Sequence, residues 1–316
     1  MPGSVIHVYH ESADYLVDRI KTIAPLRPVI GLKTPVALRA AIPEIEILFA
    51  PMPPRDGWAA AEKLRLVQLL GAGVDQLLPS PDLPSHVQVA GVRGEFAAEV
   101  TEHALALMLS HARGLPAFAD AQRAKKFEAV PRAMIAGERV TIIGNGEIGK
   151  RIARASLALD LRVRVVSRTG EGETVPGAEL VARDALASAI GDAKFVVIAV
   201  PLTPATTRLF DASMIAHMRS EAYLVNVARG GIVDEAALAE ALSAGRLGGA
   251  ALDVFDEEPL APEHPLWGVP RLTITPHVAG LGLSYIERCI DVLMTNVAAL
   301  EAGAPLKGLI NRDVGY

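Results

Sequence analysis

The sequence has a single cysteine, Cys289, and few aromatic residues, which make up 4% of its 316 positions. One cysteine excludes an intramolecular disulfide, as is usual in a reducing compartment. No apolar run reaches the length of a membrane span, and the first residues lack the basic start and apolar block of a secretory leader. We therefore expect a cytoplasmic protein without a membrane partner.

Clusters of one charge are also missing. The formal net charge is -5 and no basic block occurs, so we expect no nucleic-acid partner. No set of histidines, cysteines and acidic residues has the spacing of metal ligands, so we expect no metal ion. Apolar residues are abundant instead: they are 51% of the chain, which is long enough for two domains with their own cores.

The most informative stretch spans residues 140–153, VTIIGNGEIGKRIA. A β-branched run ends in three spaced glycines and is followed by apolar residues at helical spacing. In such a strand–turn–helix unit the glycines make the turn, admit a pyrophosphate and let the helix pack on the strand. The helix N-terminus then attracts the phosphates. We expect dinucleotide contacts from Gly144, Gly146, Glu147, Ile148 and Gly149.

Short apolar strands alternate with helices along the chain, which predicts parallel sheets covered by helices. We predict an α/β fold of two doubly wound, Rossmann-like domains, with the cofactor domain inserted into a discontinuous first domain. The helix at 98–112 and the last helix, from 283 to 302, would mark the crossings. The predicted domains are 1–97 with 284–316, and 98–283; the predicted helices of the second include 147–159, 181–190, 211–218 and 234–244.

The cofactor choice depends on the end of the second strand of the nucleotide-binding domain. An NAD site usually has an acidic residue there, which binds the ribose 2′-hydroxyl. This chain has Ser167, Arg168 and Thr169 instead. A guanidinium with two neighbouring hydroxyls suits the 2′-phosphate of NADP(H). We therefore expect a preference for NADP(H), with NAD(H) still possible if Arg168 is only a solvated charge.

Three further stretches each follow a strand of the second domain: ARGG with Arg229, DVFDEEP with four acidic residues, and TPH with His277. An arginine can fix a substrate carboxylate and polarise a ketone. A histidine can give a proton to the developing alkoxide, and a carboxylate can orient the histidine and keep it protonated. Together they form a chemically complete set for reducing a 2-oxo acid.

Two loops of the first domain, around Met52 and at Gly71-Ala72-Gly73-Val74-Asp75, also follow strands, where ligands of open α/β sheets bind. The second has glycines that can leave amide N–H groups exposed to a carboxylate. The residues alone favour a plain turn between strand and helix there. The Glu102-His103 pair, near the start of a buried helix, is expected to serve packing or capping.

In order and together, these motifs resemble those of the NAD(P)-dependent D-2-hydroxyacid dehydrogenases, above all the NADPH-dependent glyoxylate/hydroxypyruvate reductases. The resemblance covers nearly the whole chain. Its motifs are GAGVD at 71–75, VTEHALALML at 100–109, GNGEIG at 144–149, PLTPATTRLF at 201–210, VNVARGGIVDE at 225–235, LDVFDEEPL at 252–260 and TPHVAG at 275–280.

The resemblance implies hydride transfer from NADPH to a short 2-oxo acid, such as glyoxylate or hydroxypyruvate, giving the D-2-hydroxy acid in a cleft between the domains. It implies that Arg229 binds the substrate and that Glu258, before Pro259, pairs with His277 as acid/base; Asp256 and Glu257 would be solvated. With it we expect substrate contacts from Met52, Ala72, Gly73 and Val74, and cofactor contacts from Val200, Pro201, Val227, Ala228, Arg229, Asp253 and His277.

Departures from the family pattern leave the substrate side chain open. Asn145 and Glu147 occupy the glycine turn, and Arg93 and Phe96 stand where many members carry an asparagine. A phosphoglycerate or phosphite dehydrogenase is the nearest alternative; formate oxidation would not need the Glu–His pair. A dinucleotide-sensing, corepressor-like protein of the same fold is another. The resemblance and the apolar helix at 98–112 suggest a homodimer.

Overall fold

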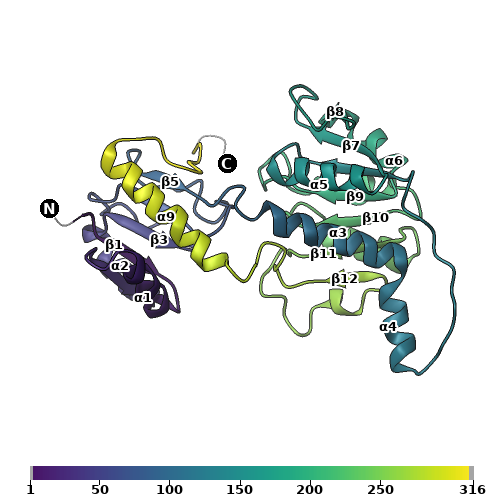
Figure 1. The fold of residues 1–316 in the computed structure, drawn as a ribbon, viewed down its shortest axis with the longest axis horizontal. Helices are drawn as coiled ribbons and strands as arrows, with labels where there is room; N and C mark the ends of the chain where they lie inside the picture. The colour runs from purple at the N-terminus through teal and green to yellow at the C-terminus, as the bar shows by residue number, and fades with distance from the viewer. Residues whose placement is uncertain (1–2, 313–316) are drawn as a thin grey trace. The chain divides into compact units, whose positions relative to one another are not determined.

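A computed structural model describes residues 3–312 of the chain. The described residues divide into two compact units: unit 1 takes its residues from Met1–Phe96 and Gly282–Tyr316, and unit 2 is Ala97–Leu281 (Figure 1). Unit 1 is thus built from both ends of the sequence. None of the helices described combines the length and the apolar character needed to cross a membrane.

The sheet of unit 1 has five parallel strands in the order β2-β1-β3-β4-β5. Its central strands are buried on both faces, as expected when helices and loops cover a parallel sheet. The strands are β1 (Ile6–Tyr9), β2 (Val29–Leu32), β3 (Ile47–Ala50), β4 (Leu66–Leu69) and β5 (Gln88–Ala90).

Helices from both ends of the chain cover one face of this sheet. Helix α1 (Ala13–Ile23) and the last helix, α9 (Tyr285–Ala302), share a core with β1 and β3 (Figure 1). On the other face, α2 (Pro35–Ala41), the short η1 (Ile42–Glu44) and the fully buried Trp58 form a second core. The chain after α9 returns to the sheet, where Leu309 bridges Ala90 in antiparallel fashion.

The sheet of unit 2 has seven parallel strands in the order β12-β11-β10-β9-β6-β7-β8. The order reverses between β6 and β9, and ligands of doubly wound sheets bind at such a switch point. The strands are β6 (Arg139–Ile143), β7 (Arg162–Ser167), β8 (Glu179–Ala182), β9 (Phe195–Ile198), β10 (Tyr223–Asn226), β11 (Gly249–Leu252) and β12 (Leu272–Ile274).

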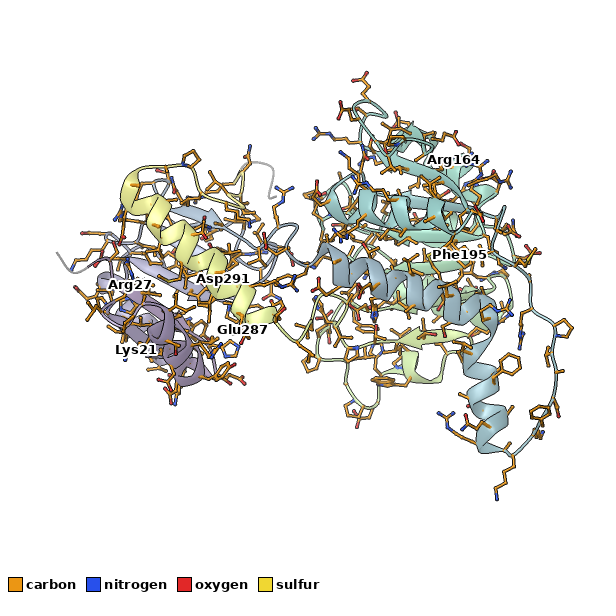
Figure 2. All side chains as sticks on the ribbon, viewed as in Figure 1. Lys21, Arg27, Arg164, Phe195, Glu287 and Asp291 are labelled. Carbon is orange, nitrogen blue, oxygen red and sulfur yellow. The ribbon has the colours of Figure 1, made fainter. Side chains whose placement is uncertain are left out.

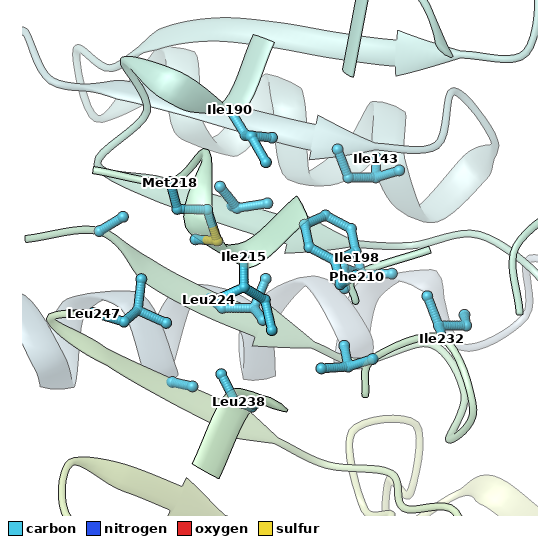
Figure 3. Close-up of a cluster of buried hydrophobic side chains, with 14 of the residues drawn as sticks. Ile143, Ile190, Ile198, Phe210, Ile215, Met218, Leu224, Ile232, Leu238 and Leu247 are labelled. Atoms are coloured by element: carbon cyan, nitrogen blue, oxygen red, sulfur yellow. The ribbon is translucent and has the colours of Figure 1, made fainter. Parts of the chain in front are cut away.

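Both faces of this sheet carry a core. Helices α3 (Ala97–Arg113) and α5 (Glu147–Ala158) pack on one face. Figure 3 shows the core on the other, where Phe210 and Leu238 lie among isoleucines and leucines of the strands. The predicted class, two doubly wound parallel-sheet domains, is confirmed. The remaining helices of the second face are η2 (Arg183–Ala185), α6 (Leu186–Gly191), α7 (Ala212–Ala216), α8 (Glu235–Ser243) and η3 (Pro265–Gly268).

The helix predicted at 181–190 is wrong in its first part, which is the edge strand β8. Leu180 and Val181 pair with β7, and the Glu179 carboxylate accepts hydrogen bonds from Arg139 and from Arg164, which Figure 2 labels at this edge. The leucine- and alanine-rich sequence favours a helix, but pairing in the sheet overrides that local preference.

An arm of unit 2 leaves the sheet between α3 and β6. It begins with α4 (Leu115–Arg123), which the sequence pattern did not predict, and continues as a long loop to β6 (Figure 1). No residue of α4 is buried, and Phe127 in the loop is fully exposed. Leu115 on α4 and Phe127 in the loop are therefore apolar side chains exposed on the surface of unit 2.

Candidate active site

The three glycines of the turn after β6 have distinct surroundings. A Cβ atom on Gly144 would lie 2.3 Å from the Ala199 carbonyl oxygen, and one on Gly149 would lie 1.9 Å from that of Gly144. Both positions therefore exclude any side chain. Gly146, the residue before α5, has nothing within 4 Å of its Cβ position. Open space at this helix N-terminus fits a phosphate group, whereas the other two glycines serve close packing.

The loops around the turn place the other expected cofactor residues. Val200, just after β9, lies against Gly144, with its Cγ1 3.2 Å from that glycine's Cβ position. The Pro201 carbonyl accepts a hydrogen bond from the Thr206 hydroxyl. Asn145 donates to the Glu173 carbonyl at 3.0 Å, which links the glycine turn to the loop after β7.

At the end of β7, two hydroxyls shape the loop and an arginine is exposed beside them. The Ser167 hydroxyl accepts from the Gly170 N–H at 2.9 Å, and the Thr169 hydroxyl accepts from the Glu171 N–H at 3.3 Å. Arg168 between them is exposed. The strand end, Ser167-Arg168-Thr169, has no acidic residue in its sequence.

The Arg229 loop follows β10 and is fixed by Asn226, the last residue of that strand. The Asn226 amide donates to the Arg229 carbonyl at 2.9 Å and accepts from the Ala228 N–H at 3.1 Å. Arg229 itself is half-buried and donates to the Ala228 carbonyl. A Cβ on Gly230 would lie 1.8 Å from the Phe255 carbonyl oxygen, so this loop abuts the loop after β11.

Asp256 corrects one sequence-based expectation, because it is not simply solvated. Its carboxylate accepts from the Gly231 N–H at 2.7 Å and forms an ion pair with Arg208, also at 2.7 Å. Asp256 therefore ties the Arg229 loop to the loop that carries Glu258. An acidic run alone could not reveal this contact, since its partners lie 25 and 48 residues away.

His277 and Glu258 form a close pair. The His277 Nδ1 and the Glu258 Oε2 are 2.6 Å apart, and the other Glu258 oxygen accepts from the Phe255 N–H at 2.9 Å. Partial burial by itself would raise the pKa of Glu258. Hydrogen bonds from His277 and the Phe255 N–H, with the charges of His277 and Arg229, outweigh burial and hold that pKa below its usual value. The carboxylate therefore stays ionised and fixes the imidazole.

The loop that carries His277 wraps around Asp253, which is 1% exposed. The Asp253 carboxylate accepts from the Thr275 hydroxyl at 2.5 Å, the Val278 N–H at 3.0 Å and the Ala279 N–H at 2.9 Å. Direct contact of Asp253 with the cofactor stays a prediction, and the structure adds an organising role. His103, expected to serve packing, has its Nε2 3.0 Å from the Thr275 hydroxyl.

In unit 1, the turn after β4 presents amide groups without partners. The backbone N–H groups of Gly71, Ala72, Gly73 and Val74 donate to no acceptor in the described part of the chain. Two carbonyl groups of the same turn do have partners. The Gly71 carbonyl accepts from the Val92 N–H at 3.2 Å, and the Val74 carbonyl accepts from the N–H groups of Leu77 and Leu78. A run of N–H groups of this kind can accept an anion, so the turn can serve a ligand as well as connect the strand to the next segment.

Met52, on the neighbouring loop after β3, is 59% exposed. The guanidinium of Arg55 in the same loop donates to the Asp75 carbonyl at 2.7 Å, which links this loop to the turn.

A metal site is a separate question. No group of three or more histidines, cysteines, aspartates and glutamates within residues 3–312 is arranged to hold an ion.

The fold and this arrangement of loops define a two-unit, dinucleotide-binding oxidoreductase class. A sequence profile described as "D-isomer specific 2-hydroxyacid dehydrogenase, NAD binding domain" matches residues 105–279. A glyoxylate/hydroxypyruvate reductase A of Yersinia enterocolitica is 31% identical over 271 residues, covering 84% of this chain and 85% of the relative. The chain belongs to the D-isomer specific 2-hydroxyacid dehydrogenase family, as the motifs indicated.

Solved structures agree with this assignment. The NADPH-dependent glyoxylate/hydroxypyruvate reductase of Sinorhizobium meliloti, in complex with NADP and sulfate, is 29% identical with a TM-score of 0.88, covering 99% of this chain and 100% of that one. A family member from Xanthobacter autotrophicus Py2, in complex with NADPH and MES, is 30% identical with a TM-score of 0.87, and each chain is covered fully.

Proposed function

We propose that this protein reduces a short 2-oxo acid, such as glyoxylate or hydroxypyruvate, to the D-2-hydroxy acid with NADPH. The observation that carries the proposal is the His277–Glu258 pair, 2.6 Å apart, on loops next to that of Arg229. These loops follow β10, β11 and β12, at the same sheet edge as the glycine turn. Relatives named glyoxylate/hydroxypyruvate reductase support the substrate class.

In the proposed mechanism each residue has one task. NADPH, when bound, supplies the hydride. Arg229 binds the substrate carboxylate and draws electron density from the ketone. The Nδ1 of His277 is engaged by Glu258, so its Nε2 is the nitrogen that delivers a proton to the carbonyl oxygen as it becomes an alkoxide. Ionised Glu258 stabilises the charged imidazole before that transfer.

We propose that unit 2 binds the cofactor and supplies Arg229 for the substrate, and that unit 1 supplies further substrate contacts. The N–H groups at Gly71 to Val74 donate to no acceptor among residues 3–312 and suit a carboxylate such as that of the substrate. Met52, exposed beside this turn, is proposed to contact the rest of the substrate. In unit 2, the open space at Gly146 fits a pyrophosphate, and the neighbouring loops carry the other proposed cofactor contacts.

The reaction is tested by following NADPH oxidation with a panel of 2-oxo acids. His277→Ala and Glu258→Gln should each lower kcat, by about 10² to 10⁴-fold for loss of general acid catalysis. Glu257→Gln is the matched control, because this neighbouring side chain is exposed and contacts none of the reacting groups. Near-normal turnover in His277→Ala would overturn the assignment, as would wild-type protein that reduces no 2-oxo acid.

NADPH is proposed over NADH because Arg168 stands where an NAD site has an acid. Complexes of two family members with NADP or NADPH support this choice. Arg168→Ala should raise the KM for NADPH at least tenfold and leave that for NADH almost unchanged, since a charged hydrogen bond contributes roughly 1.5–3 kcal/mol. Arg154→Ala, an exposed arginine further along α5, is the control. An unchanged cofactor ratio in Arg168→Ala would remove the argument.

We also propose a homodimer. The apolar face of the helix at 98–112 does not provide a dimer contact, because α3 packs in the core of unit 2. Support comes from the arm, where Leu115, Phe127 and Met134 are 54%, 106% and 76% exposed. Apolar surface of this kind marks association sites. Light scattering should give twice the chain mass for the wild type and the mass of one chain for Phe127→Asp. Val36→Asp, at an exposed position of unit 1, is the control and should keep the doubled mass. A monomeric wild type would refute the homodimer.

A cytoplasmic location is the remaining proposal. Its support is the free, buried Cys289, which suits a reducing compartment. Fractionation of the source cells with an antibody against the protein would test it, and recovery outside the cytoplasmic fraction would overturn it.

A further inference from the structure

Three polar groups of unit 2 form a continuous chain behind the His277 loop. The His103 Nε2 on α3 lies 3.0 Å from the Thr275 hydroxyl, and that hydroxyl lies 2.5 Å from the Asp253 Oδ1. A direct approach of His103 to the Asp253 carboxylate is longer, at 3.6 Å. Asp253 is 1% exposed and the His103 side chain is 21% exposed, so the chain runs from the interior to the start of α3.

Donor and acceptor rules set the direction of this chain. As a carboxylate, Asp253 can only accept, and it already accepts from the Val278 and Ala279 N–H groups. The Thr275 hydroxyl therefore donates its proton to Asp253. Its oxygen is then left to accept, and the neighbour in place to donate is His103. The ring of His103 must carry its proton on Nε2.

The segment that this chain holds has a strained backbone. His277 has a φ of 54°, in the left-handed region, although it is not glycine. Such a conformation costs about 1–3 kcal/mol and persists only where the surroundings fix it. The His277 N–H donates to the Asp253 carbonyl at 2.7 Å, and Thr275 and Val278 both donate to the Asp253 carboxylate. Of these three donors to Asp253, His277 and Val278 use the backbone N–H, and Thr275 uses its side-chain hydroxyl.

We propose that His103 is a positioning residue for the acid/base His277, an inference that rests on the proposed function. The His103 Nε2–H holds the Thr275 hydroxyl in the rotamer that donates to Asp253. Asp253 in turn keeps the Thr275–Ala279 segment closed around it, with the His277 imidazole toward Glu258. An error of about 1 Å in the placement of such a group can lower a rate by about 10²-fold.

Paired substitutions test this role. His103→Leu and Thr275→Val remove the donor and the hydroxyl with little change in size, and should lower kcat by about tenfold with KM for NADPH changed by less than about twofold. His103→Gln and Thr275→Ser keep an N–H donor and a hydroxyl, and should restore most of kcat. The control is His217→Leu, because His217 is an exposed histidine at the C-cap of α7.

A wild-type kcat in His103→Leu would overturn the proposal. A His103→Leu variant that loses both kcat and melting temperature, with neither restored in His103→Gln, would also overturn it, because that result marks a residue that only supports the fold. Nitrogen-15 NMR of the histidine rings gives a readout without turnover. The His103 signal, assigned by its loss in His103→Gln, should show the Nε2–H form at neutral pH, and an Nδ1–H form would refute the chain. Failure of the proposed function would appear separately, as a wild-type protein that reduces no 2-oxo acid.

Discussion

His277 combines an unusual backbone conformation with a short contact to Glu258. Its position after Thr275-Pro276 could be read from the sequence, and so could the acid before Pro259. The left-handed φ could not, because histidine has no local preference that demands it. That conformation results from contacts with Asp253, which lies 24 residues earlier in the chain. At this scale, residue identity predicts the chemistry, and distant contacts decide the geometry.

Residue-scale electrostatics also predict how the fold responds to acid. In unit 1 the Arg27 guanidinium binds both oxygens of Glu301, at 2.7 and 3.0 Å, and this hydrogen bonding lowers the pKa of Glu301 from 4.5 to about 2; Figure 2 labels Arg27. A lowered pKa in the folded state adds stability above pH 4.5 that is lost as the pH falls toward 2. Glu301→Gln should therefore lower the melting temperature at pH 7 and flatten its decline in that window.

Melting curves from pH 7 to pH 2 would check this effect. Glu11→Gln is a suitable comparison, because that glutamate is exposed and has no partner among the residues described. A decline in Glu301→Gln as steep as in the wild type would mean that the ion pair does not set the acid response.

At the scale of elements, strands and their ends were the most predictable part. Continuous β-branched and leucine runs marked most strands, because a parallel sheet buried on both faces needs them. The error at 181–190 came from an edge strand, where pairing with β7 and the arginines beside it outweighs helix propensity. The glycines suggested exposed amides at Gly71 to Val74, but only the tertiary structure shows that the described residues supply no acceptor for them.

The turn after β4 depends on a stack of glycines from three segments. A Cβ on Gly308 would meet the Gly91 carbonyl oxygen at 2.1 Å, and one on Gly91 would meet that of Gly71 at 2.9 Å. Gly308→Ala should therefore displace the turn and raise KM for the 2-oxo acid by about tenfold or more, with KM for NADPH unchanged.

Steady-state kinetics with each substrate varied in turn would measure this. Gly303→Ala is a close control: its φ of 67° matches the 66° of Gly308, but nothing lies within 4 Å of its Cβ position. The same rise in KM in both variants would point to backbone strain alone rather than to the stack.

At the scale of the whole molecule, the two units differ in whether one continuous segment of the sequence forms them. Unit 2 is one continuous segment with a core on each face of its sheet. Unit 1 needs α9, whose Cys289, Leu293 and Val297 are fully buried against strands from the other end of the sequence. The buried Asn296 adds hydrogen bonds to Gln68 of β4 and to the backbone of Lys307.

A fragment of residues 97–281 should therefore fold alone and bind NADPH, whereas residues 1–96 should not. Removing α9 exposes the apolar side chains it covers, and each fully buried leucine or isoleucine contributes about 1.5–3 kcal/mol. Circular dichroism on heating and fluorescence titration with NADPH would check both fragments. A cooperative transition in 1–96 alone would contradict this account of unit 1.

The sequence by itself determined the alternating α/β class, the glycine turn, the missing acid at the end of β7, and the order of motifs that identifies the family. These follow from local patterns, in which side-chain type and spacing carry the information. Only the tertiary structure decided that Asp256 bridges two loops, that Asp253 holds the strained His277 loop, and that a stack of three glycines supports the amide turn. These features join residues far apart in sequence, so they exist only once the sheets bring the strand ends together.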